Sequence, residues 1–162
     1  MIAIGYLADY PAAIPTLVKW FRDQWPDYYA SKSPASMEQD FLSEAFRDRL
    51  PSRLVAFKSN GLAGTIVLRS RAIEILPQLQ PGLGGLYVVE SQRGQGIGTE
   101  LVRSGMKLAA DQGYQTVYAT TVVAAGILER LGWEFLETVI HRDEKLALYR
   151  CNLMHPSAAS TR

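Results

Sequence analysis

Cysteine is almost absent from the sequence: Cys151 is the only one among 162 residues, so no intramolecular disulfide can form. No apolar stretch reaches the roughly 18 residues that a membrane-spanning helix needs, and no charged-then-apolar signal segment is present. Neither charge predominates, because 17 basic and 16 acidic residues are mixed along the chain and leave a net charge of +1. We therefore expect a cytoplasmic protein that binds neither nucleic acid nor a membrane surface.

Repeats and low-complexity segments are also missing, and Cys151 has no histidine or aspartate at a spacing typical of a nucleophile. We expect it to be a buried strand cysteine. A chain of this length with 48% hydrophobic residues can bury one core and is too short for two. We predict a single domain over residues 1–153, followed by a small, polar and frayed C-terminal tail over residues 154–162.

The hydrophobic pattern alternates between the period of strands and the period of helices. Ser36 and Gln39 resemble a capping box at the start of a second helix, and Asn60-Gly61 predicts a tight hairpin turn, because both central residues of a type I′ turn need φ > 0. The order β-α-α-β-β-β-α-β-α-β-β indicates an α/β (α+β) fold, a mixed and mostly antiparallel sheet with helices on both faces. The predicted strands are residues 2–7, 54–57, 63–68, 86–89, 114–121, 135–141 and 146–153; the predicted helices are 14–25, 36–50, 97–112 and 124–131, with a long loop over 69–85.

The stretch from Leu86 to Thr99 is an apolar strand that runs into a turn with three glycines and then opens a helix. Such a turn suits an anion, because glycines allow close backbone approach and the helix N-terminus carries partial positive charge. A nucleotide-hydrolase P-loop would need a lysine after Gly98, and none is there. The dinucleotide fingerprint G-x-G-x-x-G does not fit the even spacing of Gly94, Gly96 and Gly98. An ordinary tight turn stays open as an alternative.

Residues Gln92 to Gly98 resemble the Q/R-x-x-G-x-G/A loop of the GCN5-related N-acetyltransferase (GNAT) family. A second signature of that family, Asn-x-x-Ala-x-x-x-Tyr-x-x-x-Gly-Phe, falls on Thr121, Ala124, Leu128, Gly132 and Trp133. The resemblance implies the GNAT acyl-CoA N-acyltransferase fold over residues 1–153. It also implies an acetyl-CoA-dependent N-acetyltransferase (an acyltransferase) that transfers the acetyl group to a primary amine by direct attack in a ternary complex, with no metal.

The resemblance implies these sites for the co-substrate acetyl-coenzyme A. The backbone of Val88 and Val89, beside Tyr87, would hold the pantetheine arm like an added strand, and an N–H near Val88 would meet the thioester oxygen. Thr121 and Leu128 would lie near the reacting end. The pyrophosphate would be held by Gln92, Arg93, Gly94, Gln95, Gly96, Ile97, Gly98 and Thr99, with Arg93 as the nearby positive charge.

Leu128 departs from the family pattern, because relatives have at this position a tyrosine that is thought to protonate the departing thiolate. A water, Tyr87 or Tyr118 would have to replace it, although a thiol with a pKa of about 8.5 leaves tolerably well as the thiolate. For the base that deprotonates the amine, the candidates are Glu74 and His141. The departure keeps an alternative open: a catalytically weak or inactive coenzyme A-binding module that acts as a sensor or partner protein.

The acceptor is the least determined part of the prediction. Trp25, Tyr28 and Tyr29 come from the region that shapes the acceptor cleft in relatives, so the resemblance implies a partly aromatic pocket. The acceptor is expected to be a small-molecule or peptide amine. Both a monomer and a homodimer are compatible with the sequence.

Overall fold

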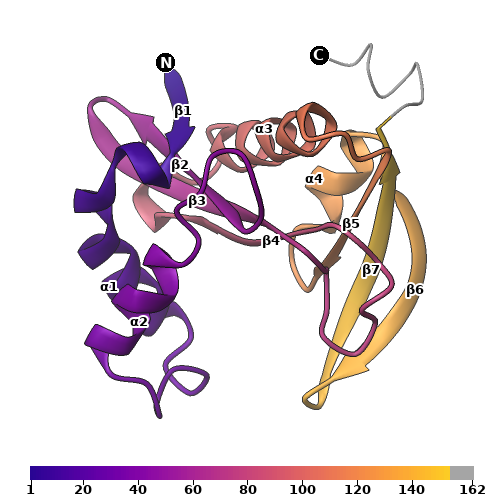
Figure 1. The fold of residues 1–162 in the computed structure, drawn as a ribbon, viewed down its shortest axis with the longest axis horizontal. Coiled ribbons are helices and arrows are strands. Elements are labelled where there is room, and N and C mark those ends of the chain that lie inside the picture. Colours follow the sequence, from indigo (N-terminus) through magenta and orange to yellow (C-terminus); the bar gives the residue numbers. More distant parts are fainter. Residues whose placement is uncertain (154–162) are drawn as a thin grey trace.

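The computed structural model describes residues 1–153 as one seven-stranded sheet in the order β1-β2-β3-β4-β5-β7-β6, with helices on both faces (Figure 1). Neighbouring strands are antiparallel except β4 and β5, which are parallel. The predicted mixed, mostly antiparallel sheet is therefore confirmed. The tail predicted over residues 154–162 lies outside the described residues. The strands are β1 (Ile2–Tyr6), β2 (Ser52–Lys58), β3 (Gly61–Arg69), β4 (Gly82–Val88), β5 (Thr116–Thr121), β6 (Glu134–His141) and β7 (Glu144–Asn152).

The helices divide between the two faces of the sheet. In β2, Val55 belongs to the hydrophobic cluster that includes α1 and α2, whereas its neighbours Leu54 and Ala56 belong to the cluster that includes α3 and α4. This alternation is the two-residue period of a strand buried on both faces. The helices are α1 (Ile14–Gln24), α2 (Pro34–Leu42), α3 (Ile97–Asp111) and α4 (Ala125–Arg130), with single 3-10 turns at Leu7–Asp9, Pro11–Ala13 and Glu90–Gln92.

The second helix differs from its prediction at both ends. Ser33, not Ser36, is the N-cap, because its hydroxyl accepts from the Ser36 N–H at 3.0 Å and Pro34 occupies the first helical turn. The helix ends at Leu42, eight residues before the predicted end at Leu50. The reason is a tertiary contact: the chain after Leu42 turns to run beside β2, where the Glu44 carbonyl accepts from the Arg53 N–H at 2.9 Å.

The β2–β3 hairpin is confirmed, but its central turn residues are Ser59 (φ 55°) and Asn60 (φ 67°), one position before the predicted pair. A β-bulge between Ala56 and Phe57 shifts the register and places Gly61 in β3 opposite Lys58.

Strand β4 begins at Gly82, four residues before the predicted start at Leu86. Its glycines are strand and bulge residues, not loop residues. Gly85 has φ +61° at an irregularity in the β3–β4 ladder, and an added Cβ at Gly82 would lie 2.3 Å from the Ala72 backbone.

Strands β4 and β5 separate almost as soon as they meet. Gly82 pairs with Tyr118, and this is the one residue pair that joins the two strands in the described part of the chain. Toward Val88 the strands diverge, so β1 to β4 and β5 to β7 form two parts of the sheet with a gap between them. In Figure 1 the first part lies on the left and the second on the right.

A buried ion pair lies where α2, β2 and the bulge of β4 meet. The Arg53 side chain is 1% exposed; its Nε donates to Glu44 Oε1 at 2.7 Å and its NH1 donates to Thr65 Oγ1 at 3.0 Å. Burial lowers the pKa of Arg53, while the Glu44 carboxylate opposes that shift. A Cβ at Gly85 would lie 3.2 Å from Arg53 NH2, so the guanidinium packs directly against the bulge.

Cys151 is 1% exposed in β7, opposite Val117 of β5. Burial raises the pKa of its thiol to about 11, so the thiol stays protonated at neutral pH and is not a nucleophile. The prediction of a buried strand cysteine is confirmed.

Candidate active site

The glycine turn after β4 is open toward solvent and needs glycine for its backbone. Gly94 has φ +79° and Gly96 has φ +86°, and a Cβ added at either position would meet no atom within 4 Å. Positive φ disfavours any side chain at these two positions, while the open space leaves room for a ligand.

Helix α3 starts directly at this turn with Gly96 as its N-cap, and no side chain caps it. The N–H groups of Ile97, Gly98 and Thr99 are the first of the helix and have no partner within it. They add to the partial positive charge of the helix end, which over 15 residues is well developed. This end can therefore bind an anionic group.

A cleft of about 640 Å³ begins at the glycine turn and follows β4 to the end of α1. Nine of the residues predicted to bind the co-substrate line it: Tyr87, Val88, Gln92, Arg93, Gly94, Gly96, Ile97, Gly98 and Thr99. Six further lining residues were not predicted: Gln24, Leu86, Val123, Ala124, Ile127 and Arg130. Ala124, Ile127 and Arg130 are three residues apart in the sequence, a spacing that places side chains on one face of a helix. This spacing could have predicted that they face the same cleft.

The backbone of Val88 points into the gap between β4 and β5. Val89 donates its N–H to the Ala63 carbonyl at 2.9 Å, and its carbonyl accepts from the Gln92 N–H at 2.9 Å. Because bonding directions alternate along an antiparallel strand, the groups of Val88 face away from β3. Both backbone groups of Val89 have partners inside the protein, and the Val88 carbonyl accepts from Arg93, so at Val88 it is the N–H that faces the gap.

Charged side chains surround the glycine turn. Arg93 Nε donates to the Val88 carbonyl at 2.8 Å, and its guanidinium lies 5.6 Å from the Tyr87 ring centroid. Arg130 of α4 reaches the same cleft. Lys58 Nζ donates to Gln95 Oε1, so the Gln95 side chain turns toward β2 and does not line the cleft. Lys58 and Arg130 were missed by sequence analysis, because neither belongs to the local motif.

Leu128 does not line the cleft; it is 3% exposed and belongs to the core between α4, α3 and the sheet. Ile127, the preceding residue, lines the cleft instead. The Thr121 side chain closes the turn before α4, because its Oγ1 accepts from the N–H of Ala124, the N-cap of the helix, at 2.7 Å. In this structure the Leu128 side chain therefore lies in the core and the Thr121 hydroxyl is bonded to the Ala124 N–H, and the ligand contacts expected of both residues stay predictions.

Leu128→Tyr is expected to lower the free energy of unfolding by about 1–3 kcal/mol, because the larger ring must be accommodated in a filled core. Ile127→Tyr is the matched control, since this side chain is only half-buried and faces the cleft. Urea denaturation of both variants measures the difference. Equal stability of Leu128→Tyr and the unsubstituted protein would show that residue 128 can turn toward the cleft.

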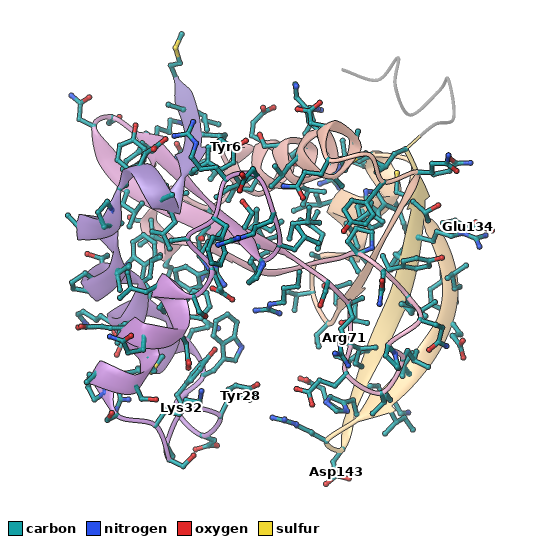
Figure 2. All side chains as sticks on the ribbon, viewed as in Figure 1. Tyr6, Tyr28, Lys32, Arg71, Glu134 and Asp143 are labelled. Atoms are coloured by element: carbon teal, nitrogen blue, oxygen red, sulfur yellow. The ribbon has the colours of Figure 1, made fainter. Side chains whose placement is uncertain are left out.

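A second cleft, of about 680 Å³, meets the first at Gln24 and Trp25, which line both. Its remaining lining residues are Pro26, Asp27, Tyr28, Glu74, His141, Arg142 and Glu144. Figure 2 marks its two sides, with Tyr28 on the connection after α1 and Asp143 at the tip of the β6–β7 hairpin. The fold thus brings Trp25 and Tyr28 together with Glu74 and His141, which are distant from them in the sequence.

Tyr29 and Tyr118, which the sequence suggests for the site, line neither of the two clefts. Tyr29 packs against Phe21, at 6.3 Å between ring centroids, and burial raises the pKa of its hydroxyl. Tyr118 lies on β5 opposite Arg150 of β7. Tyr87 lines the first cleft and contacts Trp20 and Trp25, with ring centroids 5.2 and 6.1 Å apart.

Metal-binding groups of three or more histidine, cysteine, aspartate or glutamate side chains do not occur within residues 1–153. Over the same residues, no helix has the length and apolar character needed to cross a membrane.

Comparison with known proteins gives a family match and structural neighbours. Residues 14–133 match the model of the acetyltransferase (GNAT) family. The fold is similar to aminoglycoside 6′-acetyltransferase type Ii (TM-score 0.73, 20% identity, 94% of this chain and 98% of that chain covered). It is also similar to an aminoglycoside 6′-N-acetyltransferase complexed with coenzyme A (0.71, 20%, 94% and 98%) and to an N-acetyltransferase from Staphylococcus aureus Mu50 (0.65, 18%, 94% and 99%). No curated protein matches the sequence.

Proposed function

The chain belongs to the GNAT family of acetyltransferases, and we propose that it transfers the acetyl group of acetyl-coenzyme A to a primary amine, with both substrates bound at once. One observation carries the proposal: a cleft that ends at a helix N-terminus meets a second cleft at Gln24 and Trp25. The first cleft suits a long molecule with an anionic end, and the second can hold an amine beside the point where they meet.

The chain offers each part of acetyl-coenzyme A a suitable partner. The N–H groups of residues 97–99 and the guanidinium groups of Arg93 and Arg130 would bind the phosphates. The pantetheine arm would lie along β4 in the gap, much as an added strand does, and the Val88 carbonyl would accept from it if Arg93, which now donates to that carbonyl, turned toward the phosphates. Coenzyme A in a neighbour of the same fold is consistent with this assignment.

The reaction needs a deprotonated amine nitrogen, which attacks the thioester carbonyl carbon; the C–N bond forms as the C–S bond breaks. Glu74 is the first candidate to take the amine proton and His141 the second, since both line the second cleft. The Val88 N–H is the candidate donor to the carbonyl oxygen as negative charge develops there. Replacing Glu74 and His141 in turn and measuring kcat/KM assigns the base.

The thiolate leaving group takes up one proton, from Tyr87 or from water. Tyr87 is the candidate because it lines the first cleft, whereas residue 128 is buried and Tyr118 lies outside both clefts. A thiolate of pKa about 8.5 leaves readily, so a proton donor is not essential at this step. A Tyr87→Phe variant that keeps its rate would identify water as the donor.

The proposed acceptor is a small amine. Two structural neighbours are aminoglycoside 6′-acetyltransferases. The second cleft of this chain offers carboxylates and aromatic faces, which suit cationic amines.

Calorimetry with acetyl-coenzyme A, with dephospho-coenzyme A and ATP as comparators, tests the first half of the proposal. Thiol release from acetyl-coenzyme A over a broad panel of amines tests the second half. We expect binding of acetyl-coenzyme A in preference to ATP, and thiol release that depends on the amine. Absence of any heat from a folded sample would contradict the assignment of the first cleft.

The alternative of a coenzyme A-binding module without catalysis depended on Leu128. No observation within residues 1–153 favours it, and the clefts meet as an enzyme with two substrates requires. Binding of acetyl-coenzyme A without thiol release for any amine would be the result that revives it.

A further inference from the structure

The Arg142 side chain crosses the second cleft. Arg142 lies in the turn between β6 and β7 and has φ 51°. Its guanidinium carbon lies 5.3 Å from the ring centroid of Tyr28, and its NH2 lies 3.9 Å from Glu74 Oε1. These contacts join three segments that are distant in sequence: the hairpin tip, the connection after α1 and the loop before β4.

Tyr28 and Glu74 form a cradle for a cation, with an aromatic face on one side and a carboxylate on the other. Both side chains are reachable from solvent, since Tyr28 is 57% exposed and the Glu74 side chain 74%. An exposed cation over an aromatic ring gains about 0.5–1 kcal/mol, and an exposed ion pair gains little. The contacts of Arg142 are therefore weak enough for another cation to replace them.

The charge balance of the cleft favours a cationic occupant. Asp27, Glu74 and Glu144 supply three carboxylates, against the single guanidinium of Arg142. A bound anion would have to approach these carboxylates to reach Arg142. A second ammonium group would instead interact favourably with all of them.

We infer that Arg142 is a specificity-determining residue of the acceptor cleft and occupies the place of an acceptor's second ammonium group. When that second ammonium group contacts Glu74, His141 is the base that takes the proton of the reacting amine. The inference rests on the proposed function, because it takes the second cleft as the acceptor site. Acceptors with two amino groups must displace Arg142 from Tyr28 and Glu74, whereas an acceptor with one amino group reacts without disturbing it.

Three acceptors of equal chain length test this inference: butylamine, 1,4-diaminobutane and 4-aminobutanoate. In Arg142→Gln we expect KM for 1,4-diaminobutane to fall about three- to tenfold, because the competing cation is gone. KM for butylamine should change less than about twofold. Arg150→Gln is the matched control, since it removes the same charge from the same hairpin outside both clefts, and it should leave the order of preference unchanged.

Two results would overturn the inference. If 4-aminobutanoate is the best of the three acceptors and loses affinity in Arg142→Gln, then Arg142 binds an acceptor carboxylate. If KM changes equally for all three acceptors, or for none, then Arg142 does not discriminate between them.

Calorimetric titration of 1,4-diaminobutane without acetyl-coenzyme A separates this inference from the proposed function. Tighter diamine binding in Arg142→Gln than in the unsubstituted protein supports the cation cradle even if no amine is acetylated. No diamine binding to either protein, together with no acetylation, overturns both.

Discussion

Gly96→Glu is expected to weaken the binding of acetyl-coenzyme A at least about 100-fold, because the new carboxylate would occupy the anion site at the start of α3 and repel the phosphates. Gly96 has φ +86° and no atom within 4 Å of the Cβ position, so the side chain extends into the cleft without displacing the core. The left-handed backbone adds a cost of about 1–2 kcal/mol in stability. Calorimetric titration with acetyl-coenzyme A measures the loss, after circular dichroism has shown that the variant is folded.

Gly113→Glu is the control, because Gly113 follows the other end of α3 with φ +93° and has equally open surroundings. It carries a similar backbone strain but lies outside the cleft, so its affinity for acetyl-coenzyme A should match that of the unsubstituted protein. Equal loss of affinity in both variants would mean that the effect is strain in α3. Full affinity in Gly96→Glu would show that the glycine turn does not bind the phosphates.

Glu44→Ala is expected to lower the free energy of unfolding by about 3–5 kcal/mol, because it leaves the buried Arg53 guanidinium without its carboxylate. Arg53 is 1% exposed and keeps only the hydroxyl of Thr65 as a close polar side-chain partner. Urea denaturation measures the change. A second effect should appear in the candidate site, because Arg53 packs against Gly85 in the bulge of β4, the strand that lines the first cleft.

The exposed pair of Glu134 and Arg150 provides the comparison. Glu134→Ala should change stability little, since water solvates both partners. Replacing both buried partners, as Glu44→Leu with Arg53→Met, should recover much of the stability lost in Glu44→Ala, because no buried charge is then left without a partner. A loss in Glu44→Ala no larger than that in Glu134→Ala would contradict the importance assigned to the buried pair.

Features set by neighbouring residues could be predicted from the sequence. The apolar strand, the glycine turn and the start of α3 follow each other directly, and positive φ at Gly94 and Gly96 needs only the local backbone. The order of strands and helices along the chain also followed from local signals. The predicted turn between β2 and β3 was wrong by one residue. A β-bulge between Ala56 and Phe57 sets the register there, and the residues of the turn do not encode this pairing between the strands.

Features set by tertiary contacts could not be predicted. The second helix ends early because Glu44 pairs with Arg53, a contact that helical periodicity does not encode. The orientation of α4, which buries Leu128 and turns the half-buried Ile127 toward the cleft, depends on how a six-residue helix packs on α3 and the sheet. The meeting of Tyr28, Glu74 and Arg142 joins three loops, and loop positions leave little trace in composition.

Within residues 1–153, a single residue pair joins β4 to β5. The sheet therefore has its weakest pairing between strands beside the clefts. Each part of the sheet has its own ladder of hydrogen bonds, and the hydrophobic core shared with α3 is what joins the two parts. A molecule lying in the gap would contact both parts of the sheet and thereby add a second connection between them. A filled gap should therefore raise the free energy of unfolding of both parts together, and the two sides of the acceptor cleft, which come from α1 and from the β6–β7 hairpin, would share that gain.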